Sequence, residues 1–134
     1  MINKEITILI VAYKSDTILL RNLSYLKNFN VIIIDNFKDS NLKEKITSFK
    51  NINYAKTNFN LGEGSGAKIG LGLINSKYTL YLNPDTIIDE INILKLKEIF
   101  LRYPDTGLLT PIHLNKKNEF IPNYFVHPFN QKTK

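Results

Sequence analysis

Asp85 is the residue best placed by its sequence context to bind a cation. It closes the polar tripeptide Asn83-Pro84-Asp85, which follows Tyr78–Leu82, an apolar run that indicates a buried strand. Proline cannot donate a ladder hydrogen bond and holds the preceding residue extended, so the strand should end at Asn83 with Asp85 at its carboxyl end. Ligands bind at that edge of an open α/β sheet. We interpret Asp85 as a ligand of a divalent metal carried by a nucleotide diphosphate, since substrate phosphates can supply the other ligands. A turn in which Asp85 caps the next helix is the alternative.

Two further strands should end in polar residues at the same edge. Glu5–Ala12 and Val31–Ile34 are apolar and rich in β-branched side chains, which is typical of strands buried on both faces of a parallel sheet. Asp35 follows the second strand, where it either accepts hydrogen bonds from a base or ribose or serves as a turn residue. Tyr13 follows the first strand, where its ring either stacks on a base or anchors the surface.

A glycine-rich loop precedes another predicted helix. Gly62, Gly64 and the following residues to Ala67 satisfy the G-x-G-x-x-A fingerprint of dinucleotide-binding proteins. In that fold the glycines directly follow a strand, whereas here Lys56–Leu61 intervene, so an NAD- or flavin-dependent enzyme is the weaker reading. Close packing of helix on sheet is the other explanation for these glycines, and we infer the same for Gly70 and Gly72, unless that helix is irregular.

The remaining elements alternate between strands and helices. Helices are predicted at Asp16–Lys27, after a cap at Ser40, from the glycine-rich loop with Ala67, Leu71 and Ile74 facing inward, and from Asp89 to about Leu101. Strands are predicted at Ile52–Ala55 and Leu108–Leu109, and a turn at Asn115–Asn118. This alternation predicts one α/β domain over residues 1–134, a mostly parallel sheet with helices on both faces.

The amino-acid composition excludes several classes of site and function. The 134 residues contain no cysteine and two histidines, which excludes thiolate and multi-histidine metal sites. No apolar run approaches the ~20 residues of a transmembrane helix. The net charge is +6, but the lysines are scattered and arginine is scarce, which argues against nucleic-acid binding. A cytoplasmic location is the default expectation, and the basic charge would also suit a peripheral position on an anionic membrane.

Four stretches together resemble the N-terminal, nucleotide-sugar-binding half of the family 2 glycosyltransferases, and most closely the rhamnosyltransferase branch. They are Ile8–Ser15, Val31–Asn36, Asn58–Gly66 and Tyr78–Thr86, in the order and at the distances of that family. The resemblance implies a Rossmann-like GT-A fold and inverting transfer of a sugar from a UDP- or dTDP-linked donor to a glycan or lipid-linked acceptor in cell-surface glycan synthesis.

The resemblance also implies roles for individual positions. Ala12, Tyr13 and Lys14 match the loop on the nucleobase, although the family usually has asparagine at position 14. Asp35 matches the acid that binds the base or ribose, and Gly62, Gly64 and Gly66 match the loop beside the nucleotide. Asn83 and Asp85 match the first and last positions of the D-x-D motif that holds Mn²⁺ or Mg²⁺. The family favours asparagine near positions 67 and 68, where this chain has alanine and lysine.

The acceptor-binding half of the family, with its carboxylate base, has no counterpart in this sequence. A non-catalytic or degenerate nucleotide-sugar-binding module is therefore the alternative to an enzyme. The missing half would leave a sheet edge uncovered, which is a liability for a protein in water. We expect that a second copy covers this edge, that Phe120–Phe129 folds back over it, or that the chain is a fragment of a longer protein.

Overall fold

The computed structural model describes residues 2–115, 117 and 119–121. The chain divides into two compact units, one that runs to Lys97 and one that begins at Glu98. The first unit contains every residue that the sequence analysis singled out for binding. In the described parts of both units, no helix is long and apolar enough to cross a membrane.

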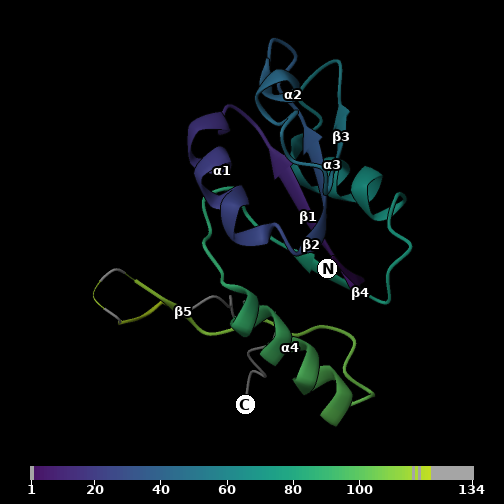
Figure 1. Ribbon diagram of the computed structural model, residues 1–134, viewed down its shortest axis with the longest axis vertical. Coiled ribbons are helices and arrows are strands. Elements are labelled where there is room, and N and C mark those ends of the chain that lie inside the picture. The colour runs from purple at the N-terminus through teal and green to yellow at the C-terminus, as the bar shows by residue number, and fades with distance from the viewer. Residues whose placement is uncertain (1, 116, 118, 122–134) are drawn as a thin grey trace, which may run out of the picture. The chain divides into compact units, whose positions relative to one another are not determined.

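A four-stranded parallel sheet in the order β3-β2-β1-β4 forms the centre of the first unit (Figure 1). Its strands are β1 (Asn3–Ala12), β2 (Phe29–Asp35), β3 (Ile52–Lys56) and β4 (Tyr78–Tyr81). Ala12 pairs with Asp35, and Asp35 pairs with Lys56, so the first three strands end side by side. The predicted parallel α/β sheet is confirmed. Within the described chain β4 pairs with β1 alone, which makes it an edge strand.

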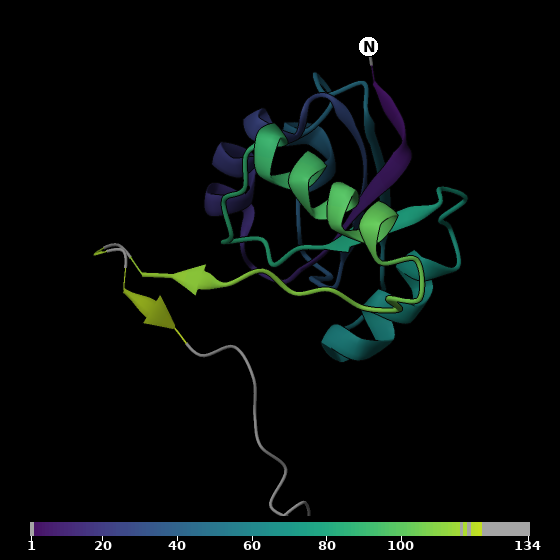
Figure 2. The same ribbon diagram turned by 90° about the horizontal axis from the view of Figure 1, so that it is seen from below.

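Helices cover both faces of this sheet. The face with Ile8, Ile10 and Ile33 packs against α1 (Asp16–Leu23), the 3-10 helix η1 (Ser24–Leu26), α2 (Leu42–Lys45) and Ile93 of α4 (Glu90–Arg102). The opposite face carries Leu9, Ile32 and Ile34 and packs against α3 (Gly62–Leu71) and the Ile74 that follows it. Figure 1 and Figure 2 show α1 and α3 on opposite sides of the strands. Each such leucine or isoleucine, when fully buried, stabilises the fold by roughly 1.5–3 kcal/mol.

The inner face of α3 differs from the prediction. Gly66 and Gly70 are the buried residues of this helix, whereas Leu71, which was expected to face inward with Ala67, is 55% exposed. A β-carbon at Gly70 would lie 2.2 Å from Cδ1 of Leu9, so the helix lies too close to the sheet for any side chain there. The predicted close packing is confirmed for Gly70. The prediction about Leu71 was wrong because hydrophobic periodicity cannot detect a face made of glycine.

The second unit has no strand at Leu108–Leu109, so that prediction was wrong. Leu108 is 89% exposed, and neither leucine belongs to a strand of either described sheet. A short antiparallel pair forms further on, from β5 (His113–Leu114) and β6 (Phe120–Ile121). Oδ1 of Asn115 accepts hydrogen bonds from the backbone of Lys117 (2.8 Å) and Glu119 (3.0 Å), which confirms the predicted turn for its described residues. The expectation that Phe120–Phe129 folds back falls mostly outside the described residues.

Candidate functional site

The loops that leave β1, β2, β3 and β4 all leave from the carboxyl edge of the sheet, because the strands are parallel. Backbone bonds hold this edge together. The amide of Asn36 donates to the carbonyl of Ala12 (2.8 Å), and the amide of Leu82 donates to the carbonyl of Leu9 (2.9 Å). The strand order reverses direction between β1 and β4, and open α/β sheets bind their ligands outside such a switch point. The structure therefore gathers the predicted positions on one edge.

Asp35 is buried at this edge, with 1% of its surface exposed. Its Oδ1 accepts the backbone N–H of Phe37 (3.0 Å), and its Oδ2 accepts the hydroxyl of Tyr54 on β3 (2.8 Å). Burial and then the bond to Asp35 raise the pKa of Tyr54, so this phenol stays protonated and remains a donor. The bond from the Phe37 amide to Oδ1 closes an Asx turn, which fits the interpretation of Asp35 as a turn residue. A base or ribose would reach this carboxylate only if the Tyr54 hydroxyl shared or left Oδ2.

An aromatic pair and a lysine stand beside Asp35. The rings of Tyr13 and Phe37 meet edge to face, with centroids 5.8 Å apart and planes at 78°. Nζ of Lys14 lies 5.5 Å from the Tyr13 centroid and 5.1 Å from the Phe37 centroid, within cation–π range. Lys14 has a left-handed backbone, φ 52°, which is uncommon for a residue with a side chain. Such strain is often found at ligand sites.

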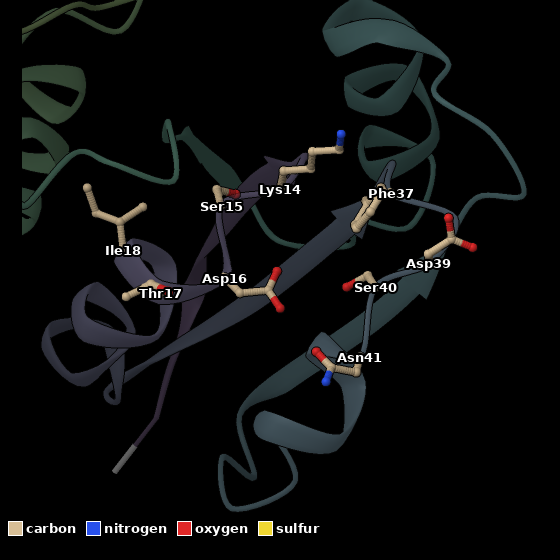
Figure 3. Close-up of a pocket in the computed structure, with 9 residues that line it drawn as sticks. All are labelled: Lys14, Ser15, Asp16, Thr17, Ile18, Phe37, Asp39, Ser40 and Asn41. Atoms are coloured by element: carbon tan, nitrogen blue, oxygen red, sulfur yellow. The ribbon is translucent and has the colours of Figure 1, made fainter.

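A cavity of about 310 Å³ opens between the β1–α1 and β2–α2 loops. Figure 3 shows the residues that line it, which are Lys14, Ser15, Asp16, Thr17, Ile18, Phe37, Asp39, Ser40 and Asn41. Asp16 in its wall is paired with Lys45 of α2 at 2.9 Å. A second hollow of about 370 Å³ shares Ser40 and Asn41 and reaches Tyr54 and Lys56. These volumes lie at the small end of the range for ligand pockets, roughly 300–1,000 Å³.

The glycine-rich loop is tied to the same edge by Asn36, which is 2% exposed. Its Nδ2 donates to the carbonyl of Gly62 (2.9 Å), and its Oδ1 accepts the hydroxyl of Thr57 (3.1 Å). Gly62 has φ 77°, a conformation that favours glycine, while a β-carbon at Gly64 would meet no atom within 4 Å. Gly66 lies one turn further along α3, against the sheet. The N-terminus of α3 is therefore fixed beside the end of β2.

A second tie joins this helix to β4. The hydroxyl of Tyr81 donates to Oε1 of Glu63 at 2.8 Å. Burial, and then the bond to Glu63, raise the pKa of Tyr81. The phenol is thereby kept as a donor, and the first turn of α3 is linked to the strand that leads to Asp85.

Asn83 and Asp85 are both exposed after β4. The backbone carbonyl of Asn83 accepts the amide of Thr86 (3.0 Å), which closes a turn around Asp85. Within the described chain, the Asp85 carboxylate makes no hydrogen bond or ion pair with another protein group. The described residues also hold no cluster of three His, Cys, Asp or Glu side chains that could bind a metal without help. A single free carboxylate fits a metal that arrives with substrate phosphates.

Four residues of this edge were missed by the sequence analysis. Phe37 and Tyr54 gave no signal, because aromatic residues beside strands are common. Asn22 and Asn36 did give one, because each is a polar residue close to an apolar run, Ile18–Leu20 or Val31–Ile34. Each is buried, and its amide is bonded to a backbone carbonyl. A polar side chain at a core position usually has a structural partner to satisfy.

The sheet order, the helices on both faces and the loops gathered at the carboxyl edge define a Rossmann-like α/β protein with a ligand site above the sheet. The family model described as Glycosyl transferase family 2 matches residues 7–132. The chain belongs to glycosyl transferase family 2, and its architecture is the GT-A fold.

Two crystal structures of S. aureus TarS share this fold. The structure of TarS 1-349 matches with a TM-score of 0.64 at 16% sequence identity. The match covers 80% of this chain and 38% of the TarS 1-349 chain. A second TarS structure has a TM-score of 0.61 at 17% identity and covers 84% of this chain and 24% of that one. The chain thus spans well under half the length of either. No curated protein matches it.

Proposed function

We propose that this chain is the donor-binding part of an inverting glycosyltransferase and holds a nucleotide-diphosphate sugar at the carboxyl edge of its sheet. The observation that carries the proposal is the convergence of the β1, β2, β3 and β4 loops on that edge, with a cavity of about 310 Å³ between the first two. Family membership supplies the reaction class. The proposal extends to a dTDP- or UDP-linked donor and to the transfer of rhamnose or a related sugar.

The aromatic pair and the buried acid would receive the nucleoside. Tyr13 and Phe37 offer ring faces and edges for a base. Asp35 would accept a bond from an N–H or ribose hydroxyl donor once the Tyr54 hydroxyl shares or leaves Oδ2. Ala12 lies directly before Tyr13, at the end of β1. The Lys14 ammonium would move away from the Tyr13 and Phe37 rings and bind the diphosphate, which is the only strongly anionic part of such a donor.

The glycine-rich loop and the Asn83–Asp85 turn would hold the diphosphate. The exposed backbone at Gly62 and Gly64 permits close approach, and Asn83 would donate its side-chain amide to phosphate oxygens. Asp85 would hold a Mn²⁺ or Mg²⁺ ion, which supplies Lewis-acid stabilisation of charge on the leaving diphosphate when it is bound. The role of Gly66 is indirect, because it lets α3 pack close to the sheet.

We propose that the reaction also uses groups of an acceptor-binding half. The acceptor hydroxyl oxygen forms a bond to the anomeric carbon as the bond from that carbon to the diphosphate oxygen breaks, which inverts the centre. The hydroxyl proton passes to a carboxylate base of an acceptor-binding half. We propose a glycan or lipid-linked acceptor, a cytoplasmic or membrane-peripheral location, and a second copy against the edge strand β4.

Calorimetric titration with UDP, dTDP and GDP, each with and without Mn²⁺, tests the proposal, with NAD as the competing ligand. We expect a nucleoside diphosphate to bind more tightly with Mn²⁺ than without. Binding of NAD alone would instead support a dinucleotide enzyme, and the donor-binding proposal would be wrong.

Asp85→Asn tests the metal assignment. It should remove the gain in affinity that Mn²⁺ provides, at least about tenfold, because the amide keeps the shape but loses the charge. The matched control is Asp105→Asn, an exposed carboxylate of the second unit, which should bind as the parent does. Equal Mn²⁺ enhancement in the parent and in Asp85→Asn would refute Asp85 as the ligand.

A non-catalytic nucleotide-sugar-binding module is the second candidate. The residues that favour it are Lys14, Ala67 and Lys68, which stand where the resemblance leads us to expect asparagine. Both candidates predict binding, and only the enzyme predicts turnover. Hydrolysis of the nucleotide sugar above a protein-free blank, lost in Asp85→Asn, would favour the enzyme.

A further inference from the structure

Asn22 is a buried polar side chain that reaches the turn around Asp85 from a distant part of the chain. It lies on α1 between Leu19 and Leu23, and only 3% of it is exposed. Its Nδ2 donates to the carbonyl of Pro84 at 3.0 Å and to the carbonyl of Thr86 at 3.4 Å. An amide placed among core leucines is unfavourable unless its hydrogen bonds are made.

The two carbonyls belong to the residues on either side of Asp85. One amide nitrogen that holds both therefore restrains the backbone on both sides of Asp85. Within the described residues, Asn22 is the only side chain that bonds the backbone of this turn. The turn's own bond, from the Thr86 amide to the Asn83 carbonyl, is local and cannot attach the turn to the body of the protein.

The other atom of the same amide shows that the position is specific. Oδ1 of Asn22 is buried and has no partner within the described chain. A buried acceptor without a partner costs stability, and the two bonds made by Nδ2 offset that cost. Leucine would remove the unpaired acceptor but would leave the carbonyls of Pro84 and Thr86 without their donor. What leucine cannot provide is a pair of N–H donors aimed at two carbonyls.

We propose that Asn22 is a positioning residue that holds Asp85 in the place from which it binds the metal of the nucleotide donor. The inference rests on the proposed function. Asn22 itself would touch neither metal nor substrate. It would act through the carbonyls of Pro84 and Thr86, by restricting the directions that the Asp85 carboxylate can take.

Asn51 provides a matched control. Its Nδ2 also bridges two backbone carbonyls, those of Leu26 (3.1 Å) and Phe29 (2.8 Å), but at the amino end of β2, on the edge opposite to the site. Asn22→Leu and Asn51→Leu thus remove the same kind of bridge from opposite edges of the sheet. Asn22→Ser, whose short hydroxyl cannot span both carbonyls, serves if Asn22→Leu does not fold.

The first measurement is amide hydrogen exchange of the intact chain. In Asn22→Leu, or in Asn22→Ser in its place, the Thr86 amide should exchange at least about tenfold faster. The Leu82 amide, bonded into the sheet at Leu9, should be unchanged. Asn51→Leu should leave both amides as in the parent. Unchanged Thr86 exchange in the Asn22 variant would overturn the proposal, whether or not any nucleotide binds.

The second measurement is the affinity for UDP and dTDP with and without Mn²⁺. The Asn22 variant should lose at least about tenfold of the Mn²⁺-dependent affinity and keep the metal-free affinity, while Asn51→Leu keeps both. In an Asp85→Asn background the Asn22 change should have no further effect, because both act on one interaction.

The proposed function and the positioning role of Asn22 can fail separately. If the parent binds neither nucleotide, the proposed function fails. If the parent binds with Mn²⁺ but the Asn22 variant behaves as Asn51→Leu does, only the positioning role fails. An additional loss in the Asp85→Asn background would equally refute it, because Asn22 would then act on binding by another route.

Discussion

Gly66 provides a direct test of how α3 fits against the sheet and the site. A β-carbon there would lie 2.7 Å from Cγ1 of Val11 and 3.1 Å from Nδ2 of Asn36. Val11 cannot turn away easily, because a β-branched side chain is stiff at χ1. Asn36 is held by its bonds to Gly62 and Thr57. Alanine at this position should therefore overpack the contact between α3 and the sheet.

The magnitude follows from two opposing effects. Overpacking a well-packed site costs about 1–3 kcal/mol. A glycine-to-alanine change in a compatible conformation contributes about 0.4–1 kcal/mol of stability, because the unfolded chain has less entropy to lose. Gly66→Ala should thus lower the free energy of unfolding by up to about 2.6 kcal/mol, with about 1.3 kcal/mol at the middle of both ranges. Gly64→Ala, whose β-carbon meets nothing within 4 Å, should raise it by about 0.4–1 kcal/mol.

Urea denaturation of the parent and both variants measures these changes. Because the two variants make the same chemical change in the same helix, the gap between them isolates the contact, and it should be about 1–3 kcal/mol. A gap below about 0.5 kcal/mol, the usual scatter of surface substitutions, would refute the close approach of α3 to the sheet.

Two other predictions concern the same edge. Tyr54→Phe leaves Oδ2 of the buried Asp35 without its partner and should lower the free energy of unfolding by about 1–3 kcal/mol in urea denaturation. Burial, and then the bond to Asp35, raise the pKa of Tyr54 above its ordinary value of 10.0. The contribution of Tyr54 to stability is therefore full below pH 10.0. It is lost as the pH rises toward the folded-state pKa, because Tyr54 ionises first in the unfolded chain. The alkaline fall in stability should be shallower in Tyr54→Phe, and an identical fall in both proteins would contradict this assignment. Lys14→Gln should weaken nucleoside diphosphate binding about 3- to 10-fold at low salt and flatten its salt dependence, whereas Lys50→Gln, at the opposite edge of the sheet, should not. Equal salt dependence in these two variants, measured by calorimetry, would remove Lys14 from the phosphate site.

Local sequence was sufficient where each residue's own chemistry decided its structure. The β-branched runs of β1 and β2 predicted buried parallel strands, and both were found. A helix was predicted to begin at Asp89; α4 begins at Glu90, and Oδ1 of Asp89 accepts the amide of Asn92 at 2.8 Å. β4 ends at Tyr81, just before the predicted end at Asn83, and Pro84 has no N–H with which to continue the ladder.

Only the tertiary structure decided which distant side chains meet. Phe37 pairs with Tyr13, Tyr54 bonds Asp35, and Asn22 reaches the Pro84 carbonyl across 62 positions of sequence. None of these contacts leaves a periodic pattern in the chain. They arise because parallel strands bring their carboxyl ends to one edge whatever loop follows each strand.

The sequence by itself determined that this chain folds as a parallel α/β protein with polar residues at its strand ends, because burial and proline act on neighbouring residues. The tertiary structure decided that α3 packs through Gly66 and Gly70, that a cavity lies between two loops, and that one buried asparagine holds the turn around Asp85. Those outcomes depend on distances between elements, and such distances are set by the packing of the whole core.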